Sequence, residues 1–81
     1  MKVRVKLFAV ARQRVGRDAV DVELSSSATI RQLRGALVEQ YPALVDVIPH
    51  VRFAVNSEYA GDTAAIPAAA EIAIIPPVSG G

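Results

Sequence analysis

The sequence predicts an α+β fold in which a mixed sheet of about five strands packs on one main helix. Two observations support this. Two short segments in the first third of the chain, residues 2–8 and 19–24, alternate apolar and polar residues, as half-buried strands do. One segment in the middle repeats apolar residues at helical spacing. With 81 residues the chain is long enough for one domain. We expect this domain to span residues 1–77 and a flexible, extended tail to follow at residues 78–81.

Residues 2–8 and 19–24 are predicted to form the first two strands, because apolar and polar residues alternate along both. If the strands pair antiparallel, acidic side chains of the second lie across from basic side chains of the first, with Asp21 and Glu23 across from Arg4 and Lys6. Each such pair contributes about 0.2–1 kcal/mol. Residues 11–18 break this alternation with several polar residues and Gly16, and they predict a short helical turn or a wide loop between the strands.

The main helix is predicted to begin after Thr29, because Gln32 follows it at the spacing of a capping box. Pro42 ends the helix, since a proline disfavours helical geometry in the residue before it. Gly35 interrupts the helix, and close packing is the only reason we expect for it. The apolar stripe of the helix consists of Ile30, Leu33, Leu37 and, at its end, Tyr41.

The second half of the chain predicts three more strands. Residues 51–55 and 58–60 flank a tight turn at Asn56-Ser57, and residues 71–75 precede two prolines that end the last strand. A hairpin, a helix and then further strands is the order of the β-grasp, or ubiquitin-like, fold; a split βαβ arrangement is the alternative. The residues predicted to be buried between helix and sheet are Val5, Leu7, Val22, Leu33, Leu37, Val55 and Ile74.

The composition excludes several classes of function. Hydrophobic residues make up 52%, which indicates a globular chain. There is no cysteine, so disulfides, Cys-ligated zinc and a thiol nucleophile are excluded. No signal peptide or membrane span is expected, and the interpretation is a cytoplasmic protein. The lone His50 has no clustered partner for metal binding or catalysis. We therefore predict that the chain is not an enzyme on its own.

The first 17 residues contain six basic side chains and no acid. A nucleic-acid footprint is one interpretation. The other is a solvated strand face, because acids follow at once and no stacking aromatics accompany the run. We expect neither a nucleic acid nor a membrane among the partners.

The chain ends in Gly80-Gly81, directly after a strand and two prolines. The prolines hold φ near −65° and stiffen the root of the tail. Two glycines without Cβ atoms can enter a narrow slot and bring the terminal carboxylate to a group on another protein. The ending is therefore suited to presenting a carboxylate outside this domain.

These features resemble the small subunit of molybdopterin synthase, a ubiquitin-like family of sulfur carriers in molybdenum cofactor biosynthesis. The resemblance covers essentially the whole chain. Its most specific part is residues 75–81, Ile-Pro-Pro-Val-Ser-Gly-Gly, and residues 7–9 and 53–56 support it. The chain differs at Ser57, where family members often carry Gly, and at residues 66–70, where they usually have an acidic Gly-Asp turn.

The resemblance implies that the carboxylate of Gly81 is adenylated by a ubiquitin-activating-type adenylyltransferase that uses ATP. A sulfur donor system then converts it to a thiocarboxylate, whose sulfur passes to the cyclic pterin precursor in the large subunit. No cofactor or metal is bound by the carrier itself. The residues implied to thread into the partners are Pro76, Pro77, Val78, Ser79 and Gly80. Those implied to contact partners are Phe8 and Ile75, with the large subunit, and Arg12, with the activating enzyme.

Other functions stay open at this point. A sulfur carrier for thiamine or tRNA thiolation, or a ubiquitin-like protein modifier, would use the same fold and the same ending. A plain β-grasp interaction module or RNA-binding module would not need the tail at all.

Overall fold

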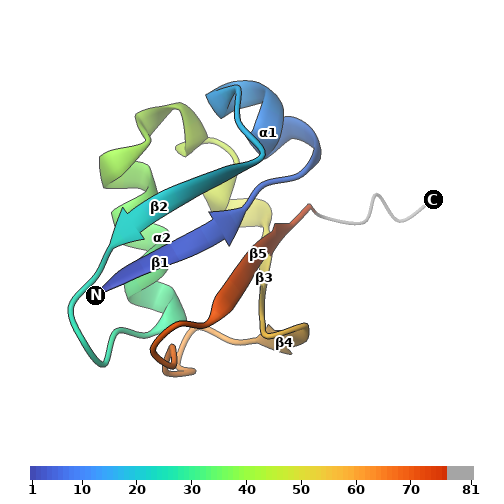
Figure 1. Ribbon diagram of the computed structural model, residues 1–81. Helices are drawn as coiled ribbons and strands as arrows, with labels where there is room; N and C mark the ends of the chain where they lie inside the picture. The colour runs from blue at the N-terminus through green and yellow to red at the C-terminus, as the bar shows by residue number, and fades with distance from the viewer. Residues whose placement is uncertain (77–81) are drawn as a thin grey trace.

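The computed structural model describes residues 1–76, in which one helix, α2, lies across the back of a five-stranded sheet (Figure 1). The strand order is β2-β1-β5-β3-β4; β1 and β5 run parallel, and the other neighbours run antiparallel. The predicted α+β, β-grasp order is confirmed. The elements are β1 Lys2–Lys6, α1 Ala9–Val15, β2 Ala19–Glu23, α2 Ile30–Gln40, the 3-10 turns η1 Pro42–Leu44 and η2 Ile48–His50, β3 Arg52–Val55, β4 Glu58–Ala60 and β5 Glu71–Ile75.

The first hairpin pairs β1 with β2 in a register that corrects one predicted pair. Arg4 lies opposite Asp21, as predicted, but Glu23 lies opposite Lys2 and not Lys6. At the end of the hairpin next to α1, the N–H of Leu7 donates to the carbonyl of Asp18 at 2.8 Å, and this bond continues the same register. Lys6 instead forms an ion pair with Glu71 of β5 at 3.3 Å.

The connection between β1 and β2 is a short helix, α1, rather than a wide loop. It begins two residues earlier than the predicted segment and buries Ala11 against the core. It ends at Gly16, whose φ of 80° is left-handed and whose N–H donates to the carbonyl of Arg12 at 2.7 Å. A glycine at this position adopts such a φ without the steric cost that other residues incur.

The core lies between α2 and the sheet. Six of the seven residues predicted to be buried are buried. Val55 is the exception, because it is the last residue of β3 before the turn and is only partly covered. Phe53, on the same side of the same strand, is fully buried and is the largest side chain of the core.

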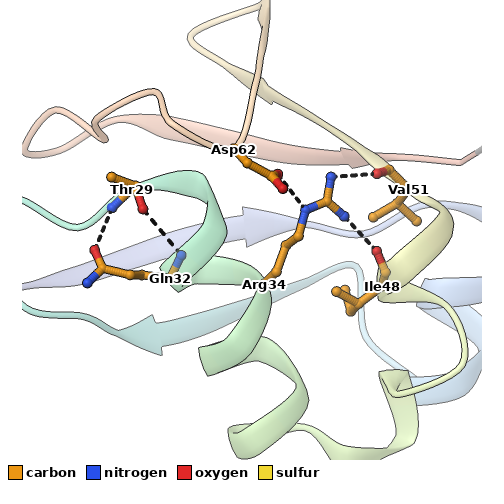
Figure 2. Close-up of polar contacts among 6 residues, drawn as sticks. All are labelled: Thr29, Gln32, Arg34, Ile48, Val51 and Asp62. Carbon is orange, nitrogen blue, oxygen red and sulfur yellow. Dashed lines mark hydrogen bonds and ion pairs between the residues drawn. The ribbon is translucent and has the colours of Figure 1, made fainter.

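Two local predictions are confirmed, namely the tight turn between β3 and β4 and the capping box at the start of α2. Asn56 and Ser57 have φ values of 50° and 71°, as a two-residue hairpin turn of the primed type requires. The capping box is formed, since the N–H of Gln32 donates to Thr29 Oγ1 at 3.4 Å and the N–H of Thr29 donates to Gln32 Oε1 at 2.8 Å (Figure 2). Close packing does not explain Gly35, because a Cβ there would meet no atom within 4 Å.

Arg34 joins α2 to three other parts of the fold (Figure 2). Its guanidinium donates to Asp62 Oδ1 at 2.8 Å and to the carbonyls of Ile48 and Val51 at 2.7 and 3.1 Å. It also lies 4.8 Å from the centre of the Phe53 ring. One side chain therefore holds the helix, the η2 turn, the start of β3 and the loop after β4 together.

Candidate functional site

The sheet face opposite α2, here called the open face, carries a cluster of apolar side chains. The apolar patch consists of Phe8, Ala54, Tyr59, Ala73 and Ile75, and it lines a shallow depression together with Lys6, Ser57 and Glu71. Phe8 and Tyr59 are 45% and 61% exposed. Large apolar side chains gathered on one exposed face are typical of a surface that binds another protein.

Phe8 reaches the open face because the in-and-out alternation of β1 continues through Leu7 and Phe8. Leu7 is buried, so the next side chain points to the opposite side of the sheet. Phe8 still has extended backbone, with φ of −133°, and precedes α1 as its N-cap residue. Ala9 then takes a φ of 51°, which turns the chain away into the helix. The first residue of α1 therefore has a left-handed φ and turns the chain out of the strand direction directly after Phe8.

Tyr59 is held on the open face by the second hairpin. Its partner across the hairpin is Ala54, so the two side chains share a face. The guanidinium of Arg52 lies 4.0 Å from the centre of the Tyr59 ring, within the range of a cation–π contact. Arg52 is also paired with Ile75 in the β3–β5 register. Arg52 therefore contacts the Tyr59 ring and also lies beside Ile75, the last residue of β5.

The predicted contact residues lie near one another. Phe8 and Ile75 line the same depression, as members of the apolar patch. Phe8 also borders a second shallow depression that Arg12 lines. Arg12 forms an ion pair with Asp18 at 3.2 Å, and both side chains are mostly exposed.

The tail residues can be placed only up to Pro76, which is half-buried directly after β5. The predicted residues Pro77, Val78, Ser79, Gly80 and Gly81 lie outside the described residues. The strand that leads to them is the central strand of the sheet, between β1 and β3.

The sequence interpretation missed Tyr59 as a member of the site. The alternation along residues 58–60 is too short to assign a face by itself. The signal was present in the turn, because a two-residue turn at Asn56-Ser57 fixes Tyr59 opposite Ala54. Ala73 could have been found from the alternation of Ile72 and Ile74, which places it on the other face of β5.

The basic residues near the N-terminus are largely balanced by acids. Lys6, Arg12 and Arg14 form ion pairs with Glu71, Asp18 and Asp46, respectively. Arg4 and Lys2 lie opposite acids of β2. Within residues 1–76, no three or more His, Cys, Asp or Glu side chains come together as a possible metal site. No helix in this described part is long and apolar enough to span a membrane.

The ThiS family model matches residues 5–81. The chain belongs to the ThiS family. Proteins similar to it include the molybdopterin synthase sulfur carrier subunits of Arabidopsis thaliana and Caenorhabditis briggsae. The first is 37% identical over all of this chain and 84% of the relative, and the second is 39% identical over all of this chain and 99% of the relative. Among solved structures, SAMP1, the small archaeal modifier protein 1 of Haloferax volcanii, superimposes with a TM-score of 0.85. It is 34% identical to this chain, and the match covers all of both chains.

Proposed function

We propose that this protein is a sulfur carrier of molybdenum cofactor biosynthesis, the small subunit of a molybdopterin synthase. The observation that carries the proposal is the full-length match to molybdopterin synthase sulfur carrier subunits in a chain that ends in Gly80-Gly81. The ThiS-family fold supports it, because the terminal residues follow the central strand of a rigid sheet.

The chemistry takes place at the carboxylate of Gly81. A free carboxylate is a poor electrophile, so an activating adenylyltransferase joins it to the AMP part of ATP and releases pyrophosphate. Hydrosulfide supplied by a sulfur donor then attacks the acyl carbon and displaces AMP, which leaves a thiocarboxylate. In the large subunit, the thiocarboxylate sulfur displaces an oxygen substituent from a carbon of the cyclic pterin precursor. Water then cleaves the bond between this sulfur and the Gly81 carbonyl, which restores the carboxylate and leaves the sulfur on the pterin. The carrier supplies the reacting sulfur at high effective concentration, and its partners supply the catalytic side chains.

The apolar patch is the proposed contact with the large subunit. The patch includes Ile75, the last residue of β5, so a partner bound there lies close to the point from which the chain continues past Pro76. Five further residues reach at most about 17 Å when extended. The Lys6–Glu71 ion pair borders the patch and gives it a polar rim, as protein interfaces commonly have. Arg12 is proposed to contact the activating enzyme.

Deletion of Gly81 tests the proposal. The shortened chain presents the wrong carboxylate and loses roughly 3.3 Å of reach, and a misplacement of about 1 Å can cost a hundredfold in rate. We expect no thiocarboxylate, measured by intact mass after incubation with ATP, the activating enzyme and a sulfur donor. Arg31→Ala, a change at an exposed position of α2 that leaves the tail unaltered, serves as the control. Full thiocarboxylate formation and pterin sulfuration by the shortened chain would refute the carrier function.

A protein modifier is the second candidate, because SAMP1 of H. volcanii is 34% identical over its full length. A modifier would transfer the adenylated Gly81 carbonyl to a lysine amine, forming an isopeptide bond and releasing AMP. Digestion of cell extracts followed by mass spectrometry distinguishes the two functions. Lysines that carry the C-terminal residues of this chain would support modification, and a terminal thiocarboxylate on the free protein supports sulfur transfer.

A further inference from the structure

One edge of the sheet is covered by side chains rather than by another strand. β2 is an edge strand, and such strands present unpaired N–H and C=O groups that can pair with another chain. Just beyond the two ends of β2, the carbonyl of Asp18 accepts a hydrogen bond from the N–H of Leu7, and the N–H of Leu24 donates to the carbonyl of Met1. The main-chain groups of Asp18 and Leu24 therefore point toward β1. By alternation, Asp21 and Glu23 direct their main-chain groups away from the sheet.

The end of α2 provides partners for these outward groups. The side-chain amide of Gln40 donates from Nε2 to the carbonyl of Glu23 at 3.1 Å and accepts the N–H of Glu23 on Oε1 at 3.2 Å. The hydroxyl of Tyr41 donates to the carbonyl of Asp21 at 2.8 Å. The primary amide thus satisfies both main-chain groups of one residue, as a neighbouring strand would.

Local structure keeps both side chains in place. Tyr41 is the C-cap of α2, its N–H donates to the carbonyl of Leu37 at 2.8 Å, and its ring packs against the core. Pro42 then begins η1, so the chain cannot continue as a helix past the β2 edge. Gln40 and Tyr41 therefore meet the edge at a fixed point of the fold.

We propose that Gln40 and Tyr41 close the β2 edge and prevent the free protein from pairing with a second copy through this strand. The side chains of Asp21 and Glu23 reinforce the effect, because two antiparallel copies of β2 would bring like charges together.

The test is the double variant Gln40→Ala/Tyr41→Phe, which removes the three hydrogen bonds and keeps the aromatic ring. Sedimentation velocity is run over a concentration series at about 0.5 M salt, where charge repulsion between strands is screened. We expect a concentration-dependent dimer for the double variant. The wild type and Glu39→Ala, a change at an exposed neighbour on the same helix, should stay monomeric. A double variant that remains monomeric throughout the series would overturn the proposal.

Amide exchange measured by NMR adds a readout that a change in stability alone does not produce. In dilute Gln40→Ala, the Glu23 amide should exchange roughly 3- to 10-fold faster, because one hydrogen bond is lost while the fold remains. In the double variant, raising the protein concentration should slow exchange at Asp21 and Glu23 while amides of β4 stay unchanged. If the double variant is too unstable for this concentration series, the test uses the single variant Gln40→Ala. An unchanged exchange rate of the Glu23 amide in this variant contradicts the proposed role of the Gln40 side chain.

Discussion

Replacement of Arg34 by alanine should destabilise the protein more than any other change of a charged residue on α2. The guanidinium makes two hydrogen bonds to the carbonyls of Ile48 and Val51, and the Arg34 side chain is only 26% exposed. Hydrogen bonds to charged groups contribute about 1.5–3 kcal/mol each, although water can replace part of this loss at a partly exposed site. The ion pair with Asp62, whose side chain is 43% exposed, adds little. We expect a total loss of about 2–4 kcal/mol in unfolding free energy.

The measurement is denaturant unfolding followed by circular dichroism, with a thermal melt beside it. A loss of this size lowers the Tm of a domain of this length by roughly 10–30 °C. Arg34→Lys should lose about half as much, because an ammonium cannot point to two separate carbonyls in the fork geometry of a guanidinium. Arg31→Ala, at an exposed position of the same helix, is the matched control, with an expected change within about 0.5 kcal/mol. If Arg34→Ala and Arg31→Ala cost the same, the bridging role assigned to Arg34 is wrong.

Three further predictions follow from packing and backbone geometry. Gly35→Ala should stabilise the protein by about 0.5–1 kcal/mol in denaturant unfolding, because alanine is the better helix former and its Cβ meets open space; destabilisation would indicate an unseen contact. Leu37→Ala should cost about 2–5 kcal/mol, since it leaves a cavity at a fully buried position, and a cost below 1 kcal/mol would contradict the core described here. Phe8→Ala combined with Tyr59→Ala should weaken binding to a molybdopterin synthase large subunit, the proposed partner, by at least about 2 kcal/mol in calorimetry without unfolding the protein; unchanged affinity would remove the apolar patch from the interface.

The sequence predicted the fold well because its local signals agree with one another. The capping box at Thr29, the turn at Asn56-Ser57 and the two periodicities all indicate the same arrangement, and each is present in the structure. The hairpin register was predicted only in part. Alternation predicts which side chains share a face of a strand, but it does not predict which residue of the neighbouring strand lies opposite. In this hairpin, the length of the α1 connection and the hydrogen bond between Leu7 and Asp18 set the pairing of β1 with β2.

The site was predictable where a side chain broke the expected alternation of burial. Phe8 is a large aromatic residue on the polar side of the predicted strand 2–8; β1 ends at Lys6, and the structure shows Phe8 exposed just before α1. Tyr59 lies in a strand of three residues, too short for a pattern, so only the paired partner reveals its face. The roles of Arg34, Gln40 and Tyr41 depend on contacts between segments 14 to 28 residues apart, which no local pattern encodes.

The position of β5 in the sheet has a mechanical consequence. Any partner that grips the end of this chain pulls on β5, which pairs with β1 on one side and β3 on the other (Figure 1). A pull along the strand loads the ladder hydrogen bonds on both sides in shear and together, whereas a pull on β2 or β4 would load a single ladder. A force applied at the end that partners would hold is therefore opposed by two ladders of hydrogen bonds rather than one.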